Sequence, residues 1–216
     1  MIKPAWIKEI TTIGWDLDGT LYPPGAIPTK VFHDKQLQTV ADKNHWSLEQ
    51  ALSEYVATYD RLGSHTKTLT NLGVDGVDFF SKFWDELDLK QYIKKDLKVA
   101  RLLDQLKGKF SQFLITNAGE MHQVDRKLKL IGINKRVFSE IVLAYEVGAK
   151  PDPASFLKTL EMAKCKPEEF LYIGDRDSTD ILGAQSVGMH TCLVWGKSKV
   201  ADVSLPTVYE VENLIG

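Results

Sequence analysis

Cysteines and long apolar runs are scarce in this 216-residue sequence. Only Cys165 and Cys192 are present, too few for a disulfide framework, so we expect both thiols to be reduced. No apolar run approaches the roughly 18 residues that a membrane-spanning helix requires. The first residues contain neither a long apolar stretch nor a small-residue cleavage site, so a secretory signal is not expected. These absences predict a cytoplasmic protein with no membrane partner.

An excess of positive charge is also lacking. The chain has 27 Lys and Arg against 29 Asp and Glu, a net charge of -2, which argues against binding of a nucleic acid polymer by bulk electrostatics. A small anionic ligand needs only local positive groups and stays possible. The hydrophobic fraction of 44% is enough for a full core. At roughly 150 residues per domain, the length predicts one domain with an elaboration or two small ones.

Short apolar runs alternate with segments of helical spacing along much of the chain. The first run is Ile10–Trp15, and Phe156, Leu157 and Leu160 exemplify an apolar face of a predicted helix. Strands that alternate with helices predict an α/β fold, with a parallel sheet covered on both faces. The later predicted strands are 113–115, 141–143, 170–173 and 191–194.

Residues 25–92 interrupt this alternation. They contain few strand-like runs and three amphipathic stretches that predict helices. We therefore expect a helical domain over 25–92, inserted into an α/β domain formed by 1–24 and 93–216. The three predicted helices are 31–43, 48–62 and 77–87.

Two carboxylates, Asp16 and Asp18, directly follow the first predicted strand and precede Gly19. In open α/β sheets ligands bind at the carboxyl ends of strands, and a regular strand would direct both side chains to the same side. Like charges this close need a cation or a proton between them, and Mg²⁺ is the usual cation at phosphate sites. Taken alone, the same residues would also suit a surface turn.

The stretch Trp15–Tyr22 resembles the nucleophile motif of the haloacid dehalogenase (HAD) superfamily, Asp-x-Asp-x-Thr after an apolar strand. Three further family motifs follow in order: Thr116 at the end of a strand, Lys150 before a proline, and the pair Asp175 and Asp180 in Gly-Asp-x-x-x-x-Asp. The resemblance covers nearly all of the chain outside the insert. It implies a Rossmann-like parallel sheet, with the insert as an all-helical C1-type cap.

The resemblance also implies catalytic roles. Asp16 would attack phosphorus and form an aspartyl-phosphate, while Asp18 would protonate the leaving oxygen and then deprotonate water. Phosphate-binding groups would be the Thr116 hydroxyl, the Asn117 backbone N–H and the Lys150 ammonium. Family dehalogenases lack an acid at the place of Asp18, so its presence favours phosphate chemistry.

The metal implied by the resemblance is Mg²⁺. Its protein ligands would be carboxylate oxygens of Asp16 and Asp175 and the backbone carbonyl of Asp18. Asp180 would act behind these ligands or through a water. We expect Asp177 to be a helix-capping or surface residue.

Substrate contacts are expected on the insert and on the loop that enters it. The Thr116–Ala118 run, with His122 after it, looks similar to cytosolic pyrimidine 5′-nucleotidases with a C1 cap, whereas phosphoglycolate and sugar-phosphate phosphatases share nearly the same motifs. The sequence leaves this choice open. The candidate contacts are Tyr22, Phe32, Tyr55, Tyr59, Arg61, His65 and Lys67.

The leading hypothesis is a Mg²⁺-dependent phosphomonoesterase that acts on a small soluble phosphate ester: a nucleoside monophosphate, phosphoglycolate or a sugar phosphate. A phosphomutase would use the same four motifs and would differ in excluding water from the phospho-enzyme. A non-catalytic interaction protein on the same fold would tolerate loss of Asp16, Asp18 or Lys150. All three residues are present, and fold analogy by itself does not decide function.

Overall fold

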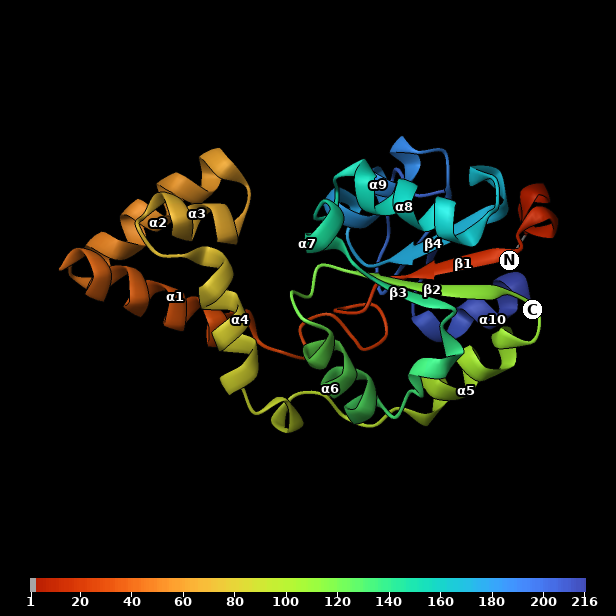
Figure 1. Ribbon diagram of the computed structural model, residues 1–216, viewed down its shortest axis with the longest axis horizontal. Helices are drawn as coiled ribbons and strands as arrows, with labels where there is room; N and C mark the ends of the chain where they lie inside the picture. The colour runs from red at the N-terminus through yellow and green to blue at the C-terminus, as the bar shows by residue number, and fades with distance from the viewer. Residues whose placement is uncertain (1–2) are drawn as a thin grey trace. The chain divides into compact units, whose positions relative to one another are not determined.

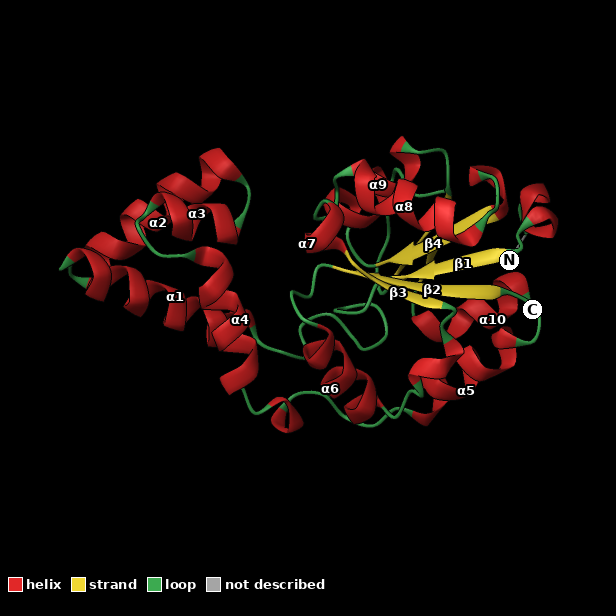
Figure 2. Cartoon of the chain, in the orientation of Figure 1, coloured by secondary structure: helices red, strands yellow, loops and turns green. Residues whose placement is uncertain are grey.

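The computed structural model describes residues 3–216, which divide into two compact units (Figure 1). One unit, here called the α/β unit, comprises the chain up to Ala26 together with Leu89–Gly216. The other, the helical unit, is Ile27–Asp88, and strands occur only in the α/β unit (Figure 2). Across the described residues, no helix has both the length and the apolar character needed to cross a membrane.

The α/β unit is built on a six-stranded, all-parallel sheet with the strand order β3-β2-β1-β4-β5-β6. This confirms the predicted α/β class. β1 is central, and Trp15 pairs with Leu114 of β2 on one side and Ile173 of β4 on the other. The strands are β1 Thr12–Trp15, β2 Ser111–Thr116, β3 Glu140–Leu143, β4 Phe170–Gly174, β5 His190–Val194 and β6 Val203–Leu205.

Helices cover both faces of this sheet, with α8 and α9 on one face and α5 and α10 on the other (Figure 1). This is the arrangement that buried parallel strands require. The α-helices of the unit are α5 Leu97–Lys107, α6 Met121–Ile131, α7 Ala144–Val147, α8 Pro153–Ala163, α9 Leu182–Ser186 and α10 Val211–Ile215. Short 3₁₀ turns span Ala5–Glu9, Leu89–Gln91, Lys135–Val137, Pro167–Glu169 and Val208–Glu210, and a π-helical turn spans Asp177–Ile181.

The α8 helix shows how local sequence fixes the packing on one face. Asp152 caps its start, with the side chain accepting a hydrogen bond from Ala154 N at 2.8 Å. Phe156 is fully buried and meets the ring of Tyr172 edge to face at a centroid distance of 5.1 Å. Leu157, expected on the same face, is 54% exposed. One residue advances a helix by 100°, which turns Leu157 away from the sheet.

The helical unit has four helices around its own apolar core. Its helices are α1 Thr29–Asn44, α2 Leu48–Leu62, α3 His65–Asn71 and α4 Gly76–Glu86. The prediction missed α3, because Leu69 is its only large apolar residue and one such residue gives no periodicity. Leu69 is nevertheless fully buried, in a core with Val40, Tyr55, Phe79 and Phe83.

Phe156→Ala is expected to lower the free energy of unfolding by about 3–5 kcal/mol, because it opens a cavity between α8 and the sheet. The matched control is Leu157→Ala on the same helix, which removes a largely exposed side chain and should cost about 0.5 kcal/mol or less. Urea titrations of both variants, followed by circular dichroism, test the difference. Equal losses would contradict the assigned helix face.

Candidate active site

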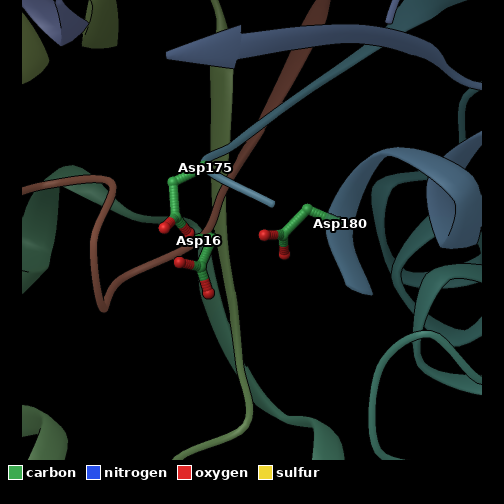
Figure 3. A group of neighbouring side chains, drawn as sticks. All are labelled: Asp16, Asp175 and Asp180. Atoms are coloured by element: carbon green, nitrogen blue, oxygen red, sulfur yellow. The ribbon is translucent and has the colours of Figure 1, made fainter. Parts of the chain in front are cut away.

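The residues of the four sequence motifs gather at the carboxyl ends of three adjacent strands. Asp16 follows β1 directly, Thr116 ends β2, and Asp175 follows β4. The backbone N–H of Asp16 donates to Ile173 O at 2.9 Å, which extends the pairing of β1 with β4 up to the site. The carboxylates of Asp16, Asp175 and Asp180 point toward one another (Figure 3).

The Lys150 ammonium joins the buried groups of the site. Its Nζ lies 2.6 Å from Asp16 Oδ1, 2.6 Å from Asp180 Oδ1 and 2.7 Å from the Tyr172 hydroxyl. Burial disfavours a charged lysine, but the two carboxylates outweigh it and raise the pKa of Lys150 above its usual value. Lys150 is therefore a permanent positive charge at the centre of the site.

The Asn117 side chain holds the backbone of Lys150 in place. Its Oδ1 accepts from Lys150 N at 2.9 Å, and its Nδ2 donates to Lys150 O at 3.1 Å. Sequence reasoning gave Asn117 a backbone role only, so this side-chain pairing is an addition. The neighbouring Thr116 is buried, and its hydroxyl oxygen accepts from Ala118 N at 3.1 Å. That bond occupies a lone pair and leaves the O–H of Thr116 to donate elsewhere.

Both carboxylate oxygens of Asp16 are engaged. Oδ1 pairs with Lys150, and Oδ2 accepts from the Thr20 hydroxyl at 3.1 Å. Burial raises the pKa of Asp16 to about 6, with Lys150 opposing this rise and the Asp180 charge adding to it. At neutral pH Asp16 is thus an oriented, poorly hydrated carboxylate, as a nucleophile requires.

Asp18 has different neighbours. Its Oδ1 accepts from the Tyr22 hydroxyl at 2.5 Å, and its Oδ2 pairs with Lys127 Nζ at 2.6 Å. Its partial burial works against ionisation, but Lys127 and Tyr22 overcome this and hold the pKa of Asp18 below its usual value. The Asp18 side chain keeps 35% of its surface exposed.

Asp16, Asp175 and Asp180 each offer an oxygen, and these atoms lie within 4.8 Å of one another. Asp175 Oδ1 is buried without a hydrogen-bond partner, and the Nε of the Arg176 guanidinium lies 3.9 Å from it. Burial, with the Asp16 and Asp180 charges, raises the pKa of Asp175 to about 7. An orphaned oxygen among crowded carboxylates fits a hard divalent cation.

Gly19 permits the close approach of the Asp16 loop to Asp175. Its φ is +89°, and an added Cβ would lie 2.5 Å from Asp175 Oδ2. Any larger residue would occupy the space beside the carboxylate.

Asp180 differs from Asp175, because its two oxygens already accept from Lys150 and from Arg176 N at 3.1 Å. The donors around Asp180 suit a supporting role better than direct coordination.

Of the two roles expected for Asp177, helix cap or surface residue, the structure does not show the first. The π-helical turn Asp177–Ile181 begins after Arg176, with no side-chain capping bond, and Asp177 Oδ1 is buried without a hydrogen-bond partner. Asp180 Oδ2 instead accepts from the backbone N–H of Arg176, the residue that precedes the turn, at 3.1 Å. Asp177 is partly exposed, which agrees with the surface alternative.

Sequence reasoning missed Tyr172 and Lys127. Tyr172 stands in a continuous apolar strand, where it is read as core, and only the fold shows its hydroxyl on Lys150. Lys127 left a usable signal: it lies three residues after Val124 and four before Ile131, on the apolar face of α6. A lysine at such a position calls for a buried anion.

The expected substrate-contact residues divide between the two units. Tyr22 belongs to the α/β unit and bonds Asp18, whereas the other six lie in the helical unit. Tyr55 is 1% exposed and its hydroxyl shares a 2.7 Å hydrogen bond with His65 Nδ1, so it is a core residue of the helical unit. Arg61 is bonded to Asn71 at 3.0 Å.

Comparison with known proteins finds one family over most of the chain. A family model described as haloacid dehalogenase-like hydrolase matches residues 13–194. The glyceraldehyde 3-phosphate phosphatase of Methanopyrus kandleri is 28% identical over 196 residues, covering 84% of this chain and 82% of the relative. The protein of the same name from Methanothermobacter thermautotrophicus is 27% identical over 206 residues, covering 86% and 85%.

Solved structures share the fold. A HAD phosphatase from Thermococcus onnurineus superposes with a TM-score of 0.67 at 22% identity, covering 96% of this chain and 98% of that one. A putative beta-phosphoglucomutase from Thermotoga maritima gives a TM-score of 0.62 at 20% identity, covering 95% and 98%. At such identities the likeness concerns the fold alone.

Asp175→Asn is expected to raise the thermal midpoint by a few degrees near pH 8 in metal-free buffer, because it removes a carboxylate that ionises with difficulty. The pKa of Asp175 is about 7 in the fold against an ordinary 3.8. Protonation of Asp175 therefore contributes its full stabilisation below pH 3.8. This contribution decreases as pH rises and is lost once pH has passed through the pKa of about 7 in the folded state. Calorimetry should show a steeper fall of the midpoint with pH in the wild type than in the variant.

The control for this measurement is Asp34→Asn, which removes an exposed carboxylate of the helical unit. It should leave the slope of midpoint against pH as in the wild type. Parallel curves for the wild type and Asp175→Asn would contradict the crowding of charge around Asp175.

Proposed function

The chain belongs to the haloacid dehalogenase-like hydrolases, and from this premise we propose that it is a Mg²⁺-dependent phosphomonoesterase acting on a small soluble phosphate ester. The observation that carries the proposal is the buried Asp16 carboxylate, held by Lys150 at 2.6 Å and by Thr20, beside the orphaned oxygen of Asp175. A nucleophile, a fixed positive charge and a place for a cation meet there.

In the first step a carboxylate oxygen of Asp16 attacks phosphorus, and the bond from phosphorus to the leaving oxygen breaks. Asp18, which Lys127 and Tyr22 keep ionised in the resting site, must first take up a proton. It then gives this proton to the leaving oxygen, so an alcohol departs and an aspartyl-phosphate remains. The Lys150 charge and the Thr116 hydroxyl oppose the negative charge that spreads over the phosphoryl oxygens. Asn117 keeps Lys150 in place through its two backbone bonds.

In the second step a water attacks the same phosphorus and gives its proton to Asp18. The bond from phosphorus to Asp16 breaks, its electron pair returns to the carboxylate, and inorganic phosphate leaves. Asp16 is restored to the arrangement set by Lys150 and Thr20. Two easier displacements thus replace one difficult displacement.

The proposed Mg²⁺ ligands are the Asp16 and Asp175 carboxylates and the Asp18 backbone carbonyl. Bound there, the cation would supply positive charge to the phosphoryl oxygens and allow an anionic phosphate to approach anionic Asp16. The raised pKa of Asp175 and its unpartnered oxygen support this choice. Asp180 supports the site through Lys150, to which it is bonded at 2.6 Å.

The proposed substrates are nucleoside monophosphates, phosphoglycolate and sugar phosphates. The two relatives named glyceraldehyde 3-phosphate phosphatase favour sugar phosphates as the first esters to assay. We further propose that the helical unit, Ile27–Asp88, is a C1-type cap that carries substrate-contact residues. Phe32, Tyr59, Arg61, His65 and Lys67 are the candidates there.

Phosphate release from a panel of these esters with Mg²⁺ tests the function, with Asp16→Asn as the blank. We expect the wild type to hydrolyse at least one ester and the variant to lose activity by more than about 10³-fold, since an amide cannot form the aspartyl-phosphate. Near wild-type turnover in the variant would overturn the nucleophile assignment. Isomerised sugar phosphate without phosphate release would identify a mutase.

Added Mg²⁺ is expected to raise the thermal midpoint of the wild type, because a ligand that binds only the folded state stabilises it by mass action. Asp175→Asn should lose most of this shift. EDTA should abolish turnover and Mg²⁺ should restore it. Full turnover in chelated buffer, or equal midpoint shifts in both proteins, would rule out the assigned metal role of Asp175.

A further inference from the structure

Lys127 is a buried lysine that belongs to none of the four motifs. It lies in the middle of α6, its side chain is 1% exposed, and its Nζ is 2.6 Å from Asp18 Oδ2. Lysine is almost never fully buried without a paired anion, and here that anion comes from a loop 109 residues earlier in the chain. The pair therefore links α6 to the motif that follows β1.

Packing alone does not account for a charge at this position. The buried face of α6 also contains Val124, Leu128 and Ile131, and an apolar side chain would continue that face. Taking an ammonium out of water is costly, and a buried ion pair often stabilises a fold no better than apolar residues of the same volume. We therefore look for the reason for the Lys127 charge in its contact with Asp18 rather than in the stability of the fold.

Asp18 is held from two directions. The Tyr22 hydroxyl donates to Oδ1 at 2.5 Å, while Lys127 donates to Oδ2. Tyr22 is four residues further along the same loop, whereas Lys127 comes from the buried face of α6. With one donor on each oxygen, the plane of the carboxylate is fixed, although 35% of the side chain is open to solvent.

We propose that Lys127 is a positioning residue for the second step: it fixes the Asp18 carboxylate where it accepts a proton from the attacking water. The water oxygen bonds to phosphorus, the phosphorus–Asp16 bond breaks with its electron pair returning to Asp16, and the proton passes to Asp18. This inference rests on the proposed function, because it assigns a role within the hydrolysis of the aspartyl-phosphate.

The test is rapid-mixing kinetics with 4-nitrophenyl phosphate, Mg²⁺ and the Lys127→Met variant. Nitrophenolate leaves without needing a proton, so the first turnover measures attack by Asp16, while steady turnover also requires hydrolysis of the phospho-enzyme. We expect a burst of about one nitrophenolate per site at close to the wild-type first-turnover rate. Steady turnover should then be about 10- to 100-fold slower than in the wild type.

The matched control is Lys129→Met, the same substitution at an exposed lysine of the same helix. It should behave as the wild type in both phases. A Lys127→Met protein whose steady turnover equals that of Lys129→Met would overturn the proposal. So would a burst slowed by the same factor as steady turnover, because that would indicate a general disturbance of the site.

A double variant keeps the proposal testable if Lys127→Met does not fold. Asp18→Asn with Lys127→Met removes both charges and leaves no buried ion unpaired. If Lys127 acts through Asp18, the double variant has the same steady turnover as Asp18→Asn alone, and a further loss of 10-fold or more would refute it. Failure of the wild type to release nitrophenolate or phosphate from any ester would instead refute the phosphatase proposal.

Discussion

The buried ammonium of Lys150 is the group on which the other site residues depend. It meets two carboxylates at 2.6 Å, Asp16 and Asp180, which would otherwise repel each other in a poorly hydrated space. Its charge is held by the Tyr172 hydroxyl from the sheet and its backbone by the Asn117 amide. One cation thereby connects the ends of three neighbouring strands.

The positive charge of Lys150 does not neutralise all the carboxylates of the site. Three carboxylates converge, and Lys150 pairs with two of them, Asp16 and Asp180. The third is Asp175, whose Oδ1 has no hydrogen-bond partner and whose pKa rises to about 7. Gly19 lies beside this carboxylate, and a Cβ added there would be 2.5 Å from Asp175 Oδ2, so a side chain at position 19 would crowd it. This uncompensated negative charge supports the proposed cation, and carboxylate oxygens are ligands that suit Mg²⁺.

The sequence alone predicts the position of a site residue where that residue lies at the end of a strand. Asp16, Thr116 and Asp175 could be assigned to one edge, because parallel strands end together. The predictions for Leu157 and α3 fail, since periodicity does not resolve a single residue on a helix or about two turns of mostly polar sequence. Lys127 meets Asp18 across 109 residues of chain, a contact that only the fold shows, while Tyr172 stands in an apolar strand whose pattern gives no sign of its hydroxyl contact.

The two aspartates of the first motif differ in solvent access as their proposed tasks differ. Asp16 is 3% exposed and fixed by Lys150 and Thr20, which strips water from the oxygen that is to attack phosphorus. Asp18, which is proposed to give and take protons, keeps 35% of its side chain exposed. A carboxylate that contacts water but is fixed by hydrogen bonds can exchange protons while its orientation stays the same. The proposed nucleophile and the proposed acid–base group, two residues apart in the chain, thus differ in their access to solvent.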